Sequence, residues 1–351
     1  MKPMRLFYLP NESLEGDQVG PRQAFEQLLD DGRLAAYQAH SYLVERRRHA
    51  SHEVALVELK AAVTAFAPDV IFWQHVHDGY PLAGEFLAGL KAGSSRPKLV
   101  YHEADAYGRY VKRMDHTLRA MLAACDLAVL VGLGDLARLA REAGAPRVML
   151  APHSCDETRF GRPWQPTGVR RFDALMVANL SCRMRIPGWH LPGGAKRKRL
   201  AQLFHRAYAE RFAVFGAGQG WAAAPYCQGP IPFDQQEATI RSAWLSVNWG
   251  QFDELPMYAS DRLAISLAAG VPHITNHQPG YELLFPNARG LYAVTSPGEA
   301  LDVADMLLSL PREHLIEIGL QGMAYALQHL TARRVYADLI TAIGQQLLGP
   351  P

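Results

Sequence analysis

RLAISLAAGVP, residues 262–272, runs directly into HITNHQPGYELLF, residues 273–285, and this stretch decides the fold. Apolar residues at helical spacing predict a helix over residues 262–269. The short apolar run that follows predicts a buried strand over residues 273–276. A glycine-containing loop then leads toward the next helical turn. Helix, buried strand and loop in this order are typical of an α/β sheet.

The same alternation extends through the second half of the chain. Further strands are predicted at residues 174–178, 212–215 and 245–248, and further helices at residues 198–208, 235–242, 297–308, 315–327 and 333–348. The first half repeats the pattern without a detectable sequence repeat. Its strands are predicted at residues 6–9, 70–73, 99–102, 127–131 and 148–151, and its helices at residues 21–29, 51–66, 110–124 and 135–143. Ser51 and Asp135 are expected to cap the second and fourth of these helices.

Proline and glycine replace the apolar periodicity at residues 162–168, RPWQPTG, which we interpret as a linker. The predicted domains are therefore residues 1–161 and 169–330, with a separate helical segment at residues 331–351. Because ligands bind beyond the carboxyl ends of the strands in doubly wound sheets, we expect two Rossmann-like α/β domains facing each other across a cleft.

The composition is that of a globular protein. The 351 residues are 49% hydrophobic and 20% charged, which argues against long disordered segments. A formal net charge of +2 gives no reason to expect nucleic-acid binding. The 4 cysteines have no metal-ligand spacing. Without a signal peptide or a membrane-spanning apolar run, the expected location is cytoplasmic.

Three segments carry a resemblance to a known family. They are residues 262–285, residues 151–160 (APHSCDETRF), and residues 97–105 (PKLVYHEAD). In this order they resemble GT-B glycosyltransferases, nearest to family-4-like and CgeB-like members (glycosyl transferases group 1). The resemblance implies a nucleotide-sugar donor domain at 169–330, an acceptor-side domain at 1–161, and a last helix that crosses back to the first domain. An apolar stripe that includes Val335 and Ile343 requires that helix to be buried.

One feature departs from the family-4 pattern. That pattern places two glutamates, seven residues apart, before the Ala-Gly-x-Pro step, whereas aligned on Gly270 the two positions are Met257 and Ile265. The charged contact that would hold the nucleotide ribose is therefore absent there, which leaves the donor binding mode and the stereochemistry open. The chain also lacks an Asp-x-Asp triplet. We expect a metal-independent hexosyl- or related transferase, with no cofactor beyond the nucleoside-diphosphate-sugar.

Cations gather around the start of the first helix of the second domain. Arg183 and Arg185 precede it, and Lys196, Arg197, Lys198 and Arg199 lie at or near its start. A helix amino terminus disfavours cations, so an anion in the loop would explain the placement. The resemblance assigns the donor diphosphate to Arg183, Lys196 and Arg197. A solvated basic face stays open as the alternative.

Glycines supply further candidate contacts to the donor. Gly218 belongs to a Gly-x-Gly-x-Gly run directly after a strand, where a close backbone approach to a nucleotide and a plain turn are both open. Gly280 precedes Tyr281 and Glu282 in a strand-to-helix loop. Their amide groups are expected near the diphosphate, and Glu282 near a ribose or sugar hydroxyl. A carboxylate that merely favours a helix amino terminus is the alternative for Glu282.

The first domain offers the catalytic candidates. Gly16 and Asp17 lie between its first strand and first helix, in a loop that the resemblance directs toward the donor phosphate and the acceptor. His102 ends a strand and is implied to touch the transferred sugar, with a structural histidine as the alternative. His75 and His77 follow the neighbouring strand on one face. No third metal ligand is evident, so we predict a hydroxyl binder or base there and no metal site.

The leading interpretation is transfer of a sugar from a nucleoside-diphosphate donor to an acceptor hydroxyl. The sequence does not identify that acceptor, which could be a glycan, a small molecule or a protein. Two alternatives remain: a nucleotide-sugar epimerase on the same scaffold, and a non-enzymatic two-lobed small-molecule-binding protein.

Overall fold

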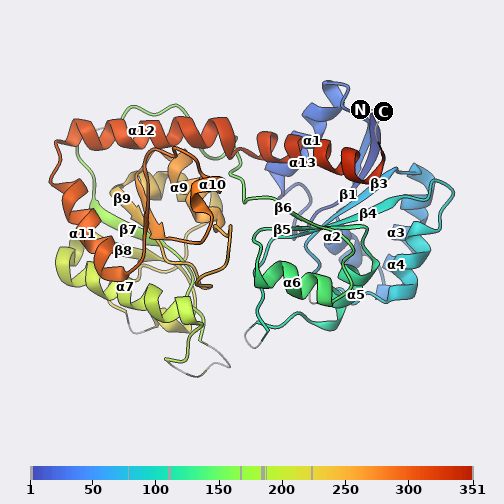
Figure 1. The fold of residues 1–351 in the computed structure, drawn as a ribbon, viewed down its shortest axis with the longest axis horizontal. Coiled ribbons are helices and arrows are strands. Elements are labelled where there is room, and N and C mark those ends of the chain that lie inside the picture. Colours follow the sequence, from blue (N-terminus) through green and yellow to red (C-terminus); the bar gives the residue numbers. More distant parts are fainter. Residues whose placement is uncertain are drawn as a thin grey trace. The chain divides into compact units, whose positions relative to one another are not determined.

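The structure is a computed structural model that describes residues 3–77, 79–109, 112–166, 168–182, 186, 188–222 and 224–349. The chain forms two compact units. Unit 1 consists of Met1–Pro152 and Ala332–Pro351, and unit 2 consists of His153–Thr331. Each unit contains a single parallel sheet covered by helices (Figure 1). In the described part of the chain no helix combines the length and the apolar character needed to cross a bilayer.

The sheet of unit 1 has six strands in the order β2-β1-β3-β4-β5-β6, and every pair is parallel. The strands are β1 (Met4–Leu9), β2 (Leu34–Ala39), β3 (Val70–Gln74), β4 (Lys98–Glu103), β5 (Leu127–Leu130) and β6 (Val148–Leu150). The chain reverses its direction of winding between β1 and β3, so the sheet is doubly wound.

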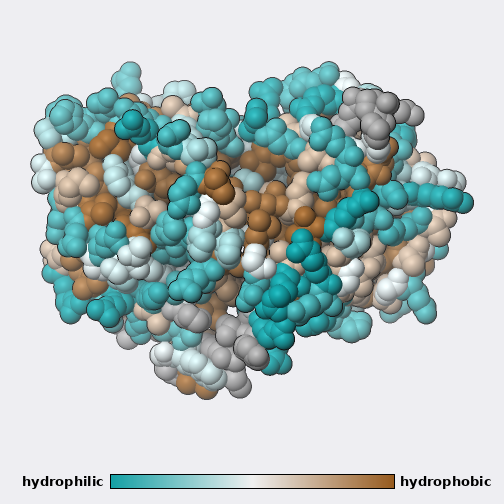
Figure 2. Space-filling model, viewed as in Figure 1, coloured by the Kyte–Doolittle hydropathy of each residue, from teal (hydrophilic) through white to brown (hydrophobic). Residues whose placement is uncertain are grey.

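Helices connect these strands and bury their apolar faces on the sheet. They are α1 (Val19–Asp30), α2 (Tyr42–Arg48), α3 (His52–Phe66), α4 (Gly84–Lys91), α5 (His116–Ala124), α6 (Asp135–Glu142) and α13 (Ala332–Leu347). In α6, for example, Leu136 and Leu139 are buried, whereas Arg138 pairs with Glu142 on the outer face. Hydrophilic side chains accordingly gather over α6 in Figure 2.

Unit 2 repeats the architecture with five parallel strands in the order β11-β10-β9-β7-β8. Its strands are β7 (Phe172–Val177), β8 (Phe212–Phe215), β9 (Ala243–Val247), β10 (His273–Asn276) and β11 (Leu291–Val294). Its α-helices are α7 (Pro192–Tyr208), α8 (Gln236–Arg241), α9 (Asp261–Ala268), α10 (Tyr281–Leu284), α11 (Pro297–Leu308) and α12 (Arg312–His329). The short 3₁₀ turns are η2 (Ala209–Arg211), η3 (Gln219–Trp221) and η4 (Phe233–Gln235).

Two cores hold unit 2 together, one on each face of its sheet. Phe204 of α7 and Leu307 of α11 belong to the first core. Leu267 of α9 and Ala326 of α12 belong to the second. The carboxyl ends of β7 and β9, where this sheet reverses its winding, therefore lie between helices on opposite faces.

The last helix, α13, packs on unit 1, as the predicted crossing back requires. Val335, Leu339 and Ile343 of its apolar stripe are buried in the same core as Phe25 of α1. The ring of Tyr336 meets that of Phe25 edge to face, with centroids 5.2 Å apart. Burial of this stripe against α1 explains why the chain returns to its first unit after Thr331.

The division between the units falls at Pro152, earlier than the predicted end of the first domain at residue 161. The backbone N–H groups of Gly161 and Arg162 both donate to Glu237 of α8. The ring of Trp164 then stacks under Arg170. The predicted linker at residues 162–168 is thus tied to unit 2 by contacts that its proline and glycine content does not reveal.

The doubly wound α/β prediction is confirmed, and most predicted elements are present within a few residues. β2, β11 and the short helices α2, α4 and α10 were not predicted, because each offers only a few periodic residues. Helix α7 begins at Pro192, earlier than predicted, and α5 begins at His116, later than predicted. Ser51 caps α3 as expected. Gly134 is the cap of α6, and Asp135 is its first residue.

Candidate functional site

The two positions where the winding reverses are the places to look for ligands, because the loops that leave the flanking strands separate there. In unit 1 this position lies between β1 and β3, and in unit 2 between β7 and β9. Five of the predicted site residues lie in loops that follow strands: Gly16, Asp17, His75, Gly218 and Gly280.

In the loop after β1, the charged group at the centre is Glu12. Its carboxylate is buried, accepts from the guanidinium of Arg22 at 2.5 Å, and also accepts from the hydroxyl of Ser41. Burial alone would raise the pKa of Glu12, but these hydrogen bonds hold it below its ordinary value. The predicted Asp17 is exposed, and Gly16 adopts a positive φ of 87°. The sequence reasoning missed Glu12.

At the ends of β3 and β4, His75 and Glu103 form a polar pair. His75 Nδ1 lies 2.7 Å from Glu103 Oε1, and the hydroxyl of Tyr101 donates to Glu103 Oε2 at 2.5 Å. Glu103 is 1% exposed, so its carboxylate is held in one place. His75 itself has φ +43°, a strained conformation for a histidine. The predicted candidate His75 is thus joined by Glu103, which the sequence reasoning missed.

The protonation of His75 follows from this pairing. Burial would lower the pKa of the imidazole, but the hydrogen bond and the charge of Glu103 together raise it above its ordinary value. No described residue shares a hydrogen bond with His75 Nε2. A histidine whose one nitrogen is fixed by a buried carboxylate is the usual arrangement of an oriented general base.

The structure places the predicted sugar contact His102 elsewhere. Its ring packs against Phe72 and Tyr336, with centroids 5.9 and 6.1 Å away, inside the core beneath α13. Because neighbouring side chains of a strand point to opposite faces, His102 and Glu103 diverge, and only Glu103 reaches His75. This placement favours the structural alternative for His102.

Among the described residues, one group of side chains could offer metal ligands. Ligand atoms of His75, Glu103 and Asp105 lie within 4.8 Å of one another. Asp105, however, pairs with Lys112 at 2.6 Å, and Glu103 already accepts three hydrogen bonds. A cation would have to displace these partners. His77, the other predicted candidate, accepts from the N–H of Gly79 in a local turn.

In unit 2 the predicted cationic loop is divided among different environments. Lys196 is half exposed, with Nζ 3.1 Å from Asp253 Oδ2. Arg197 is buried, and its guanidinium donates to the carbonyl oxygens of Trp249 at 2.6 Å and Asn179 at 2.5 Å. Burial lowers the pKa of Arg197 to about 9. Arg183 and Arg185 lie outside the described residues.

Arg197 therefore stabilises the fold, unlike the exposed basic residues near it in the sequence. Asn179 follows β7 and Trp249 follows β9, so the guanidinium ties together the two loops at the point where the sheet reverses. The alternative of a solvated basic face does not hold for Arg197, because consecutive helical residues point about 100° apart and Arg197 faces inward.

The Gly-x-Gly-x-Gly run after β8 packs on protein. A Cβ at Gly218, which has φ +112°, would overlap the carbonyl oxygen of Leu180. A Cβ at Gly216 would overlap the carbonyl oxygen of Ala178. These glycines let the loop after β8 approach the loop after β7, which accounts for them without a nucleotide.

The loop after β10 supports the loop after β9. Asn276 Oδ1 accepts from the N–H of Gly250 at 2.6 Å, and Gln278 Oε1 accepts from the N–H of Leu255 at 2.9 Å. Gly280 adopts φ +89° at the cap of α10. These contacts hold residues 250–257 beside the loop that contains Gly280.

The two residues that follow Gly280 differ in exposure. Tyr281 is buried, and its ring meets that of Phe285 edge to face. Glu282 is exposed and lies 2.9 Å from Nε2 of His277, a contact that lowers the pKa of Glu282. Of this pair, only Glu282 presents its side chain to solvent.

Comparison with known proteins agrees with this architecture. Residues 196–341 match the family model described as "Glycosyl transferase-like". No curated protein sequence matches the chain.

Three solved structures of similar fold are remote from this chain in sequence. HepE of Anabaena, in complex with UDP and glucose, has a TM-score of 0.59 and 12% identity, over 97% of this chain and 100% of that one. The α,α-trehalose-phosphate synthase (UDP-forming) of Burkholderia vietnamiensis has a TM-score of 0.57 and 12% identity, over 99% and 100%. A glycosyltransferase of Rickettsia africae has a TM-score of 0.54 and 9% identity, over 98% and 99%.

The fold is thus the two-unit α/β fold of GT-B glycosyltransferases, and the predicted resemblance to that group is confirmed. The match to the glycosyl transferase-like family model bears out the predicted enzyme class, a glycosyltransferase.

Proposed function

We propose that this protein transfers a hexosyl or related group from a nucleoside-diphosphate-sugar to an acceptor hydroxyl. The proposal is carried by the glycosyl transferase-like match over residues 196–341, which spans Lys196, Arg262 and the Gly280–Glu282 turn at the carboxyl edge of unit 2. HepE, a solved structure of similar fold, is described in complex with UDP-glucose. Donor binding is assigned to unit 2 and acceptor activation to unit 1.

His75 is the proposed acceptor-side base. Its Nε2 takes the proton of the acceptor hydroxyl as that oxygen bonds to the sugar, while the bond between the sugar and the diphosphate breaks. Glu103 fixes the proton on Nδ1 and stabilises the imidazolium that forms. Because the pKa of His75 is raised, the base is neutral and active only above that pKa, so the rate rises with pH.

The reaction needs neither a cofactor nor a divalent metal in this proposal. The leaving diphosphate gains negative charge as the glycosidic bond breaks, and cationic side chains and backbone N–H groups can stabilise it. Turnover is therefore expected to survive EDTA. Loss of turnover with EDTA and its recovery with manganese would contradict the metal-free mechanism.

A thermal-shift panel with UDP, GDP, ADP and dTDP tests the donor assignment. A nucleotide at a hundred times its Kd adds about 2.7 kcal/mol of stability, which raises the Tm visibly. If none of the four changes the Tm at millimolar concentration, the proposed function is wrong.

Turnover of the nucleotide-sugar matching the bound nucleotide, assayed with a set of acceptor alcohols, then tests His75. His75→Ala is expected to reduce turnover at least a hundredfold, about 2.7 kcal/mol of barrier, and to leave nucleotide binding unchanged. His49→Ala, a histidine at the end of α2, is the matched control and should keep full activity. Full turnover in a folded His75→Ala variant would exclude the base.

A further inference from the structure

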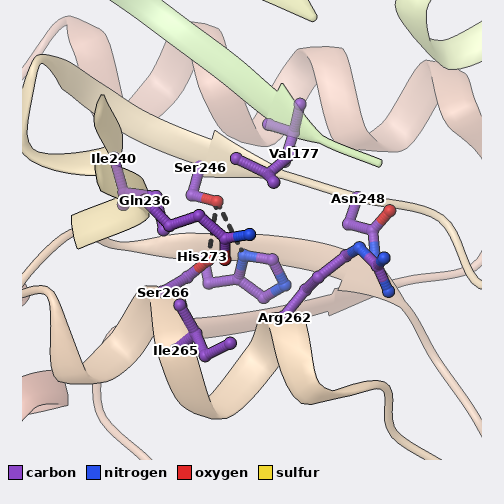
Figure 3. Close-up of a pocket in the computed structure, with 10 residues that line it drawn as sticks. Val177, Gln236, Ile240, Ser246, Asn248, Arg262, Ile265, Ser266 and His273 are labelled. Carbon is purple, nitrogen blue, oxygen red and sulfur yellow. Dashed lines mark hydrogen bonds between the residues drawn. The ribbon is translucent and has the colours of Figure 1, made fainter. Parts of the chain in front are cut away.

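His75 in unit 1 and His273 in unit 2 each bond through Nδ1 to a neighbouring side chain, but of the two only His75 can meet a substrate. His273 Nδ1 lies 3.2 Å from Ser246 Oγ, which lies 2.9 Å from Ser266 Oγ (Figure 3). The cavity beside this group measures about 10 Å³, room for about one water. The side chain of His75, in contrast, is 16% exposed. Reactivity toward a bound molecule is therefore sought at His75.

The backbone of His75 lies in the left-handed region, with φ +43°. Residues with a Cβ are disfavoured there, whereas glycine is not. In this conformation His75 Nδ1 lies 2.7 Å from Glu103 Oε1. A strained backbone persists only where its surroundings hold it, so the neighbours of residues 75–77 must provide that support.

The hydroxyl of Tyr42 supplies two of the contacts that hold this segment. It donates to the carbonyl oxygen of His75 at 2.8 Å and accepts from the N–H of His77 at 3.1 Å. A phenol can do both at once because it carries one donor and accepting lone pairs. On the other side, the N–H of His75 donates to the carbonyl oxygen of His102 at 2.8 Å. The hydroxyl thus bridges the two residues that flank Val76.

Tyr42 is itself fixed in place. It is the first residue of α2 and is 0% exposed. Its ring meets those of Trp73 and Tyr80 edge to face, with centroids 5.4 and 4.7 Å away. Burial raises the pKa of the Tyr42 phenol, which therefore keeps its proton and can donate. The contact to His75 is made by a rigid group.

A second tyrosine acts on the same segment in a different way. The hydroxyl of Tyr101 accepts from the N–H of Val76 at 3.3 Å and donates to Glu103 Oε2 at 2.5 Å. A change at Tyr101 would disturb the carboxylate and the backbone together. The Tyr42 hydroxyl bonds to backbone atoms of the segment, so a change there isolates the effect of backbone geometry.

We propose that Tyr42 is a positioning residue for the acceptor-side base, because its hydroxyl holds residues 75–77 in the conformation that directs His75 toward Glu103. This inference rests on the proposed function. Tyr42 acts through His75 and does not itself exchange a proton with the acceptor.

Melting temperatures test the strain without any assay of turnover. His75→Ala keeps a Cβ in the left-handed region and His75→Gly does not, so His75→Gly is expected to melt about 2 °C above His75→Ala. With Tyr42→Phe added to both variants the segment can relax, and the difference should vanish or reverse. If His75→Gly does not melt above His75→Ala, or if the difference survives Tyr42→Phe, Tyr42 does not hold a strained segment and the inference is overturned.

Turnover tests whether the held conformation serves the base. Tyr42→Phe keeps the ring contacts and is expected to lower kcat about tenfold, with the KM for the nucleotide-sugar and the nucleotide Kd unchanged. Added to His75→Ala, it should cause no further loss, because it acts through His75. Tyr37→Phe is the matched control, since the buried hydroxyl of Tyr37 on β2 has no hydrogen-bond partner among the described residues. It should keep full turnover.

The outcomes separate this inference from the proposed function. A folded Tyr42→Phe protein with wild-type kcat, while His75→Ala is impaired, overturns the inference alone. An equal further loss when Tyr42→Phe is added to His75→Ala would show that Tyr42 only supports the fold, and also overturns it. Full turnover in His75→Ala would overturn the base of the proposed function, and with it the positioning role.

Discussion

At the carboxyl edge of unit 1 the buried carboxylates are paired by other side chains, whereas at the same edge of unit 2 the buried guanidinium of Arg197 is not. Glu12 is enclosed by Arg22 and Ser41, and Glu103 by His75 and Tyr101. In unit 2, Arg197 reaches only backbone carbonyls. In the described part of the unit, Asn248, Arg262 and His273 each have one buried side-chain atom without a hydrogen-bond partner.

The difference follows from the groups that each edge holds. A buried carboxylate surrounded by donors is fixed before any substrate arrives, which suits a base that must be aimed at a hydroxyl. Buried polar atoms without partners are costly unless a ligand or water completes their hydrogen bonds. Unit 1 therefore resembles a preorganised reactive edge, and unit 2 resembles an edge that a ligand or water completes.

Removal of Arg197 should produce the largest effect in this comparison. Arg197→Ala leaves the carbonyls of Asn179 and Trp249 without a donor, so we expect a loss of about 3 kcal/mol in the free energy of unfolding. Arg199→Ala, an exposed neighbour, should change it by less than about 0.5 kcal/mol. Urea unfolding of both variants measures the difference. Equal midpoints would show that Arg197 has no structural role and would leave it available for the diphosphate contact that the resemblance implies.

Glu103→Gln tests whether unit 1 is preorganised by charge. The Glu103 carboxylate raises the pKa of His75. In Glu103→Gln the rise of kcat/KM with pH should therefore occur at lower pH. A glutamine no longer fixes the proton on Nδ1 of His75, so part of the imidazole carries it on Nε2 and cannot act as the base. Turnover should therefore also fall about fortyfold, which is roughly 2.2 kcal/mol of barrier. Glu142→Gln, which breaks only a surface pair on α6, is the control. A pH profile that does not move would show that Glu103 only supports the fold.

Gly193→Ala probes the close approach of α7 to the loop after β9. A Cβ there would overlap the carbonyl oxygen of Gly250, a backbone atom that cannot rotate away. We expect a loss of about 2 kcal/mol in unfolding free energy and weaker nucleotide binding in unit 2. Tm and nucleotide titration measure the two effects. Unchanged stability would mean that this edge is looser than the structure indicates.

Gly16→Ala is the matching change in unit 1, with the smallest effect. No atom lies within 4 Å of a Cβ at Gly16, but its φ of +87° is strained for alanine. A loss of about 1 kcal/mol is expected, with nucleotide binding unaffected. If the variant lost nucleotide binding instead, the loop after β1 would belong to the donor site, as the resemblance implies.

Much of the fold could be predicted from the sequence, because burial on both sides of a parallel sheet leaves a local pattern of short apolar runs between helical stretches. Elements with little such pattern were missed, notably β2 and β11. The boundary at Pro152 depends on contacts between residues far apart, such as those of Glu237 with the start of the predicted linker. No local signal reports them.

The candidate site, like the fold, was predicted from the sequence only in part. The sequence by itself identified His75 and the carboxyl edges, because strand ends can be located from apolar runs alone. Only the tertiary structure decided that His102 packs in a core, that Arg197 binds carbonyls, and that Arg262 stands beside unpaired buried atoms. The physical reason is that the direction and the partners of a charged side chain are set by segments distant in the chain, whereas its position at a strand end is set locally.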